Sequence, residues 1–122
     1  MKKILVVDDE RQIRRALGLN LTAREYQVVY ADTGEAAMQA AAIEHPDLVL
    51  LDLGLPGLSG IGVIEALRGW SKVPIIVLTA RDDEHSKLVA LDAGADDYLT
   101  KPLGMPALLD RIRLALREPA GS

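Results

Sequence analysis

Residues that could carry out chemistry stand at or just after the carboxyl ends of four short apolar segments of this chain. The segments are residues 4–7, 48–51, 75–78 and 98–100, and the residues are Asp8 with Asp9, Asp52, Thr79, and Tyr98 with Lys101. Continuous apolar segments rich in β-branched residues are typical of parallel strands buried on both faces. The carboxyl ends of such strands lie at one edge of a sheet, where ligands bind. The sequence therefore predicts that these residues converge on one site.

The acidic residues of this predicted site indicate a metal ion. The three carboxylates of Asp8, Asp9 and Asp52 would repel one another unless a cation lay among them. Oxygen ligands without a nearby histidine or cysteine select a hard cation, and we expect Mg²⁺. Because Mg²⁺ takes few carboxylates and leaves room for a phosphate oxygen, the arrangement suits phosphoryl transfer.

Lys101 and Thr79 add groups that suit the same chemistry. A lysine ammonium can neutralise one phosphoryl oxygen, and a threonine hydroxyl can donate a hydrogen bond to another. Pro102 keeps the backbone of Lys101 out of the helical conformation and so restricts the direction of this lysine.

Each of these residues also has an explanation without chemistry. Asp8 or Asp9 would cap a helix that begins near residue 11, and Asp52 would start a turn. Thr79 and Tyr98 suit a strand, and Lys101 before proline suits a surface turn. The combination of all of them at one predicted edge favours the functional interpretation. Trp70 is expected to be a packing residue beside a loop.

The composition restricts the class of protein. The chain has 122 residues, which suits one globular domain, and its net charge of −4 argues against binding nucleic-acid phosphates on its own. It has no cysteine, which excludes disulfides, zinc–thiolate sites and thiol catalysis. The apolar segment after Lys3 is too short for a signal peptide or a membrane span, so we expect a cytoplasmic protein without membrane contact.

Strand and helix patterns alternate along the chain. We expect strands at residues 4–7, 27–31, 48–51, 75–79 and 98–100, and helices at about residues 11–24, 34–44, 61–68, 84–93 and 106–117. Asp32 or Thr33 is expected to cap the second helix, and Gly94 to close the fourth. The pattern predicts one α/β domain in which five helices surround a doubly wound, five-stranded parallel sheet.

In order and spacing, several segments of the chain resemble the receiver domain of bacterial response regulators. The segments are residues 6–9, 46–52 with Leu55, Pro56 and Gly60, 77–80, 93–98, and Lys101 with Pro102. The resemblance covers essentially the whole chain. It implies a flavodoxin-like, CheY-like fold, with residues 1–117 as the receiver domain. Residues 118–122 would be a tail, or the start of a linker to a DNA-binding domain outside this sequence.

The resemblance also implies a role for each site residue. Asp52 would be the phosphoacceptor, and Thr79 and Lys101 would bind the phosphoryl group. Tyr98 would be the aromatic residue that moves with Thr79 in the switch. The metal ligands would be Asp8, Asp9, Asp52 and the carbonyl of Gly54, and the Lys101–Pro102 peptide bond would be cis.

A narrower resemblance is to the OmpR/PhoB-like subfamily, whose receivers precede a winged-helix DNA-binding domain. Lys87, Asp96, Asp97 and Arg111 resemble the charged face through which those receivers dimerise, on the fourth helix, fifth strand and fifth helix. Within the subfamily, residues 52–56 and 67–71 are most similar to potassium-responsive regulators, which are partnered by a sensor histidine kinase. This implies control of potassium-transport genes, with DNA bound only through the further domain.

Three positions differ from the family pattern. Leu103 replaces the usual phenylalanine after Lys101–Pro102, and Ser59–Gly60 replaces an acidic residue followed by glycine. Ala107 replaces a glutamate that would face Lys87, so one ion pair of the dimer face is missing, while an Asp97–Arg111 pair is still expected.

Alternative functions remain open at this point. A receiver catalyses only its own phosphorylation and dephosphorylation and is otherwise not an enzyme. A degenerate receiver would act only as an interaction module. A Mg²⁺-dependent phosphohydrolase with Asp8 as nucleophile usually needs a second aspartate where this chain has Glu10. A flavodoxin-type cofactor module needs a phosphate-binding loop, and the acidic loop after residue 7 lacks the glycines and hydroxyls for one.

Overall fold

The computed structural model of this protein describes residues 1–102 and 104–118. The predicted effect of Leu103 on packing, and residues 119–122 of the predicted tail, lie outside the described residues. The strands are β1 (Lys3–Val7), β2 (Gln27–Ala31), β3 (Leu48–Leu51), β4 (Ile75–Thr79) and β5 (Asp97–Thr100). The helices are α1 (Arg11–Thr22), α2 (Gly34–Glu44), α3 (Gly60–Arg68), α4 (Glu84–Ala93) and α5 (Met105–Ala115).

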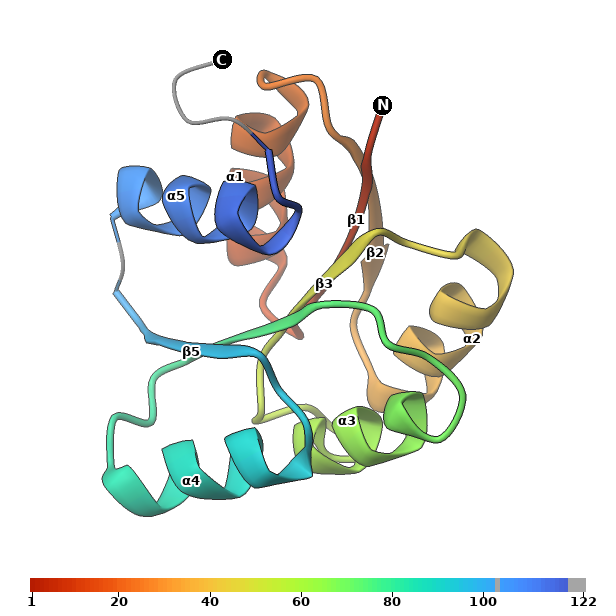
Figure 1. Cartoon of the computed structure of the whole chain (residues 1–122), viewed down its shortest axis with the longest axis vertical. Coiled ribbons are helices and arrows are strands. Elements are labelled where there is room, and N and C mark those ends of the chain that lie inside the picture. Colours follow the sequence, from red (N-terminus) through yellow and green to blue (C-terminus); the bar gives the residue numbers. More distant parts are fainter. Residues whose placement is uncertain (103, 119–122) are drawn as a thin grey trace.

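All strand pairs are parallel, and the strand order is β2-β1-β3-β4-β5. In Figure 1, α1 and α5 cover one face of this sheet, and α2, α3 and α4 cover the other. The prediction of a doubly wound α/β domain with five strands and five helices is therefore confirmed.

The hydrophobic core lies in two layers because successive strand residues point to opposite faces of the sheet. Ile4 and Val6 of β1 pack with residues of α1 and α5, whereas Leu5 and Val7 pack with residues of α2 and α3. The central strands β1, β3 and β4 are almost entirely buried on both faces, which is why their sequences are continuously apolar rather than alternating. The edge strands β2 and β5 are only partly buried.

Two helices differ in length from the prediction. The first ends at Thr22 rather than near Arg24, because Glu25 takes a left-handed backbone conformation with φ of 68°. The last begins at Met105, so Pro106 lies in its first turn, where the missing N–H is not needed. It ends at Ala115 rather than near Arg117, which takes a left-handed backbone conformation with φ of 56°. Thr33 rather than Asp32 caps α2, and its side chain accepts a hydrogen bond from the backbone N–H of Ala36 (3.0 Å).

The register of the sheet places the functional residues at one edge. Val7 pairs with Leu51, and Leu51 pairs with Val77, so the residues that follow β1 and β3 emerge beside the end of β4. The backbone N–H of Lys101 donates to the carbonyl of Thr79 (2.7 Å), and the Lys101–Pro102 bond is cis, as predicted. Among the described residues, no helix has both the length and the apolar character needed to cross a membrane.

Candidate phosphoryl-transfer site at the carboxyl edge of the sheet

Apart from two tyrosines, three polar side chains are buried in the part of the chain that the structure describes, and all three lie at this edge. Asp8 is 2% exposed, Asp52 is 9% exposed and Thr79 is 2% exposed. Burying a charged or polar group costs free energy unless partners compensate for the lost water. The concentration of this cost at three neighbouring strand ends marks the edge as the candidate site.

Lys101 bridges the two buried carboxylates. Its Nζ lies 2.8 Å from Oδ2 of Asp8 and 3.4 Å from Oδ2 of Asp52. Burial opposes the charged form of Lys101, but the hydrogen bond with Asp8 and the charges of Asp52 and Asp8 outweigh it, so the pKa of Lys101 is raised. The ammonium therefore stays charged and offsets the repulsion between the two carboxylates.

Glu10 is a member of this site that sequence reasoning missed. Carboxylate oxygens of Asp8, Glu10 and Asp52 all lie within 4.8 Å of one another. The loop turns because the backbone N–H of Glu10 donates to Oδ1 of Asp8 (2.9 Å), and Oε1 of Glu10 lies 3.8 Å from Nζ of Lys101. Asp9 is exposed and is not part of this cluster, so its predicted metal role stays a prediction.

The donor chemistry of the site fits a hard divalent cation. The three converging side chains offer carboxylate oxygens only, which are the ligands that Mg²⁺ prefers. Gly54 is exposed, its N–H donates to Oδ1 of Asp52 (3.3 Å), and no atom lies within 4 Å of the position that a Cβ would occupy. The backbone beside Asp52 is therefore open to a ligand.

Thr79 and Tyr98 are both tied to the backbone of Arg81, a residue that the sequence did not single out. The hydroxyl of Thr79 accepts a hydrogen bond from the N–H of Arg81 (3.3 Å), and the hydroxyl of Tyr98 donates to its carbonyl (2.5 Å). Tyr98 is buried, and burial followed by the nearby charge of Asp83 raises its pKa. The two residues predicted to move together thus share one partner segment.

The loop between β3 and α3 is held in place at two points along its length. Leu53 and Leu55 are buried on either side of the exposed Gly54. Near its tip, the N–H of Leu58 donates to Oε1 of Glu35 (3.1 Å), a contact between residues 23 positions apart that no local sequence signal predicts. The loop is therefore anchored by the core and by α2.

The residues of the predicted dimer face have two different environments. Asp97 pairs with Arg111 as expected, with Nη1 2.7 and 2.9 Å from the two carboxylate oxygens. Asp96 instead accepts hydrogen bonds from Arg68 (2.9 Å) and from the N–H of Ile75 (2.8 Å), so its carboxylate is engaged within the chain. Lys87 is exposed on α4.

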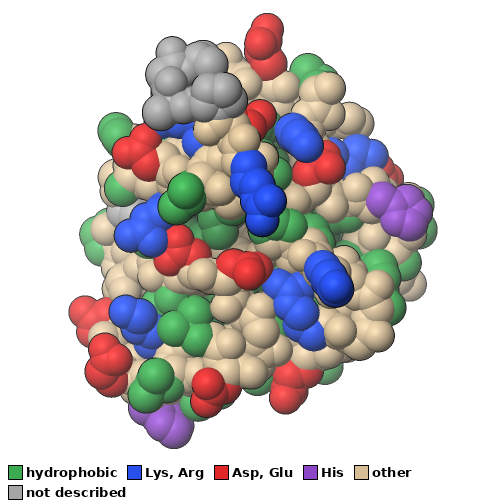
Figure 2. Space-filling model, viewed as in Figure 1, with side chains coloured by type: hydrophobic (Ala, Val, Ile, Leu, Met, Phe, Trp, Pro, Cys, Tyr) green, Lys and Arg blue, Asp and Glu red, His purple; other side chains and the backbone are tan. Residues whose placement is uncertain are grey.

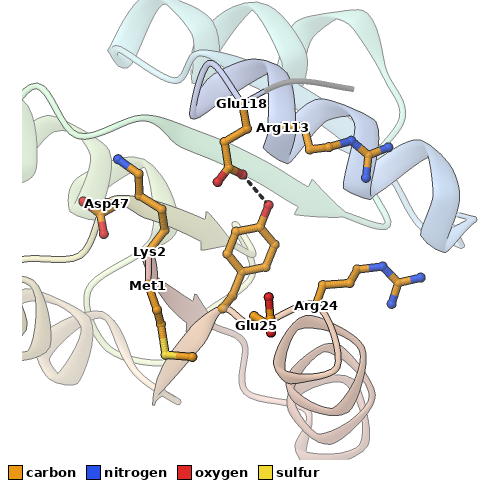
Figure 3. A pocket seen from close by; sticks show the side chains of 8 residues that line it. Met1, Lys2, Arg24, Glu25, Asp47, Arg113 and Glu118 are labelled. Carbon is orange, nitrogen blue, oxygen red and sulfur yellow. Dashed lines mark hydrogen bonds between the residues drawn. The ribbon is translucent and has the colours of Figure 1, made fainter. Parts of the chain in front are cut away.

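A pocket of about 920 Å³ lies at the opposite edge of the sheet, where the strands begin (Figure 3). Its lining residues include Lys2 before β1, Tyr26 before β2 and Asp47 before β3. The hydroxyl of Tyr26 donates to Glu118 (2.6 Å), and burial together with this carboxylate raises the pKa of Tyr26 to about 12. None of the predicted site residues lines this pocket.

Two surface features complete the description. In the view of Figure 2, acidic and basic side chains are interspersed rather than gathered into a block of one sign. Trp70 was expected to be a packing residue, but it is 52% exposed and so packs only partly against the rest of the chain. It borders a small cavity with His45 and Pro46 at the ends of α2 and α3.

Comparison with known proteins decides the family. The model of the response regulator receiver domain matches residues 4–113 of this chain. The chain belongs to this family. The matched range contains every predicted site residue from Asp8 to Arg111, so the receiver-domain resemblance is confirmed over nearly the whole chain.

Among curated receiver proteins, the chain is similar to the transcriptional regulatory protein KdpE of Mycobacterium tuberculosis (strain ATCC 25618 / H37Rv), with 59% identity. It is 50% identical to the KDP operon transcriptional regulatory protein KdpE of Escherichia coli (strain K12). Each match covers 97% of this chain and 52% of the relative, so the chain spans about half the length of these regulators. The predicted similarity to KdpE-type regulators is confirmed.

Among solved receiver structures, the chain is similar to the BeF3-activated N-terminal receiver domain of Klebsiella pneumoniae RstA. The TM-score is 0.92 and the identity is 37%, over 96% of this chain and 100% of the other. The fold is therefore that of a receiver domain.

Proposed function

We propose that this receiver domain accepts a phosphoryl group on Asp52. The observation that carries the proposal is the position of the Asp52 carboxylate, which is buried at the end of β3 and lies 3.4 Å from the Lys101 ammonium. A nucleophile for phosphoryl transfer needs this placement, because positioning and charge neutralisation supply most of the catalysis.

In the proposed reaction, an oxygen of Asp52 attacks the phosphorus of the donor. The bond between phosphorus and the leaving group breaks, and the leaving group departs with the electron pair, as the imidazole of a kinase histidine or as acetate from acetyl phosphate. The product is an acyl phosphate on Asp52. Mg²⁺, held by Asp8, Asp9, Asp52 and the carbonyl of Gly54, would neutralise charge on the transferring oxygens. Lys101 and Thr79 would bind two of those oxygens.

The same groups offer a route from phosphorylation to a change of shape. If the hydroxyl of Thr79 turns to the phosphoryl group, the N–H of Arg81 loses its present acceptor. Tyr98, bound to the carbonyl of the same residue, would then turn into the space that Thr79 leaves. Shifting a two-state equilibrium from 1:99 to 99:1 needs a difference of about 5.5 kcal/mol, which two charge-assisted contacts and dimerisation would share.

Phosphorylation would favour a homodimer through α4, β5 and α5. Leu88 and Val89 of α4 are exposed beside Lys87 and suit the apolar part of such an interface. Asp97 and Arg111 pair within one chain and would have to be shared with the partner. Exposed ion pairs are worth only about 0–1 kcal/mol each, so the absence of a glutamate at Ala107 weakens the dimer without preventing it.

The names of the KdpE relatives support the wider role that we propose. The phosphoryl donor would be a KdpD-like sensor histidine kinase in a cytoplasmic two-component system. The output would be transcription of potassium-transport genes through a DNA-binding domain that follows the receiver of residues 1–117, with residues 118–122 as a tail or as the start of the linker. The receiver would catalyse only its own phosphorylation and dephosphorylation.

The intact mass of the protein after brief incubation with acetyl phosphate tests this function. We expect one added phosphoryl group in the presence of Mg²⁺, none without it, and none in Asp52→Asn. Full labelling of Asp52→Asn would contradict the assignment of the nucleophile. An absence of labelling from both acetyl phosphate and a histidine kinase would favour a degenerate receiver, and steady turnover of a phosphate ester would favour a phosphohydrolase.

A further inference from the structure

Arg14 of α1 makes a contact with the acidic site that the proposed chemistry does not use. Its Nη1 donates to the backbone carbonyl of Asp8 (2.7 Å), and the residue is partly buried. A guanidinium donor makes this a charge-assisted hydrogen bond, which is roughly twice as strong as a neutral one. The side chain thus reaches from the second turn of the helix back to the end of β1.

With this contact, every polar group of Asp8 has a partner. Its N–H donates to Ala31 of β2 (3.1 Å), its Oδ1 accepts from Glu10, and its Oδ2 accepts from Lys101. Arg14 takes the remaining group, the carbonyl. The peptide between Asp8 and Asp9 is therefore held in one orientation, and so is the direction in which Asp9 leaves the strand.

Helix stability does not explain a cation at this position. A positive charge near the amino end of a helix is unfavourable because the helix dipole is positive there. The first turn of α1 contains no acidic residue, and its N-cap, Glu10, makes no capping hydrogen bond with its side chain. The connection between the loop and the helix is made instead by Arg14, through Asp8.

We propose that Arg14 is a positioning residue for the Mg²⁺-binding loop of residues 8–10. This inference rests on the proposed function. By holding the carbonyl of Asp8, Arg14 keeps the carboxylates of Asp8 and Glu10 facing Asp52, so that the cation meets a preformed set of oxygens. It acts on metal affinity rather than on the reacting phosphoryl group.

Isothermal titration with Mg²⁺ of the unphosphorylated protein tests this role, with Arg15→Met as the matched control for Arg14→Met. Both variants lose one positive charge, but Arg15 is exposed on the same helix. Loss of a nearby cation would by itself tighten Mg²⁺ binding, since like charges repel. Loss of positioning weakens Mg²⁺ binding, and we expect about tenfold weaker binding in Arg14→Met. Arg15→Met should change the affinity less than about twofold.

A second measurement separates positioning from chemistry. The rate of labelling by acetyl phosphate, followed against Mg²⁺ concentration, should need more Mg²⁺ in Arg14→Met and return to within about twofold of the unmodified protein at saturation. If Arg14→Met does not fold, Arg14→Lys against Arg15→Lys replaces the pair. An unchanged or tighter Mg²⁺ affinity in the Arg14 variant would overturn the role of Arg14 alone. Failure of the unmodified protein to bind Mg²⁺ or to be labelled would overturn the proposed function as well.

Discussion

At the scale of the residue, Lys101 has two roles, and both depend on its positive charge. It offsets the repulsion between Asp8 and Asp52, and it is proposed to bind the transferring phosphoryl group. We expect Lys101→Met to lower the rate of labelling by acetyl phosphate at saturating Mg²⁺ by at least about tenfold. Lys72→Met, which removes an exposed lysine at the far end of β4, is the control. Equal rates in the two variants would show that Lys101 has no part in phosphoryl transfer.

The types of the site residues were predictable, and some of their geometry was not. Asp8, Asp52 and Lys101 follow apolar strands, and Thr79 is the last residue of one. The strand order brings these strand ends together whatever the details of the loops. Glu10 rather than Asp9 belongs to the observed cluster, because the backbone N–H of Glu10 donates to the side chain of Asp8 and so turns the chain. Contacts of this kind depend on side-chain directions, which residue spacing alone does not contain.

At the scale of the element, Gly60 at the start of α3 lies close to the backbone that follows β3, and its N–H donates to the carbonyl of Leu53 (3.2 Å). A Cβ at Gly60 would lie 2.5 Å from Cα of Leu53 and 2.8 Å from the carbonyl oxygen of Asp52. We expect Gly60→Ala to lower the free energy of unfolding by about 1–3 kcal/mol, since backbone must move to admit the methyl group. The measurement is urea denaturation. Gly54→Ala, where the space is open, should change the free energy of unfolding by less than about 0.5 kcal/mol. A similar loss of stability in both variants would argue against close packing at Gly60.

The elements themselves were well predicted because their signals are local and repeated. Continuous apolar segments mark the strands, and helical spacing with capping residues marks the helices. The ends were less predictable, as at Thr22, where Glu25 adopts a left-handed conformation that propensity does not favour. The hydrogen bond from Leu58 to Glu35 joins residues 23 positions apart, so it could be predicted only from the packed fold.

At the scale of the whole molecule, the Tyr26–Glu118 hydrogen bond connects the α1–β2 turn to the residues after α5. The fold raises the pKa of Tyr26 from 10.0 to about 12, which means that the protonated form is favoured in the folded state. This contribution to stability is complete below pH 10 and is lost as the pH rises from 10 to about 12. In urea denaturation, Tyr26→Phe should lack this part of the alkaline loss, and an identical pH dependence in both proteins would contradict the assignment.

The two edges of the sheet thus have separate tasks: one holds the reactive carboxylate, and the other holds the turn and the end of the last helix. The central claim concerns the first edge and is that Asp52 carries the phosphoryl group. Reduction of the labelled protein with borohydride converts a phosphorylated aspartate to homoserine, which peptide mass spectrometry locates. The account predicts homoserine at position 52, in amounts that follow the extent of labelling. Homoserine at position 8 or 9, or a stable phosphate on another residue type, would contradict it.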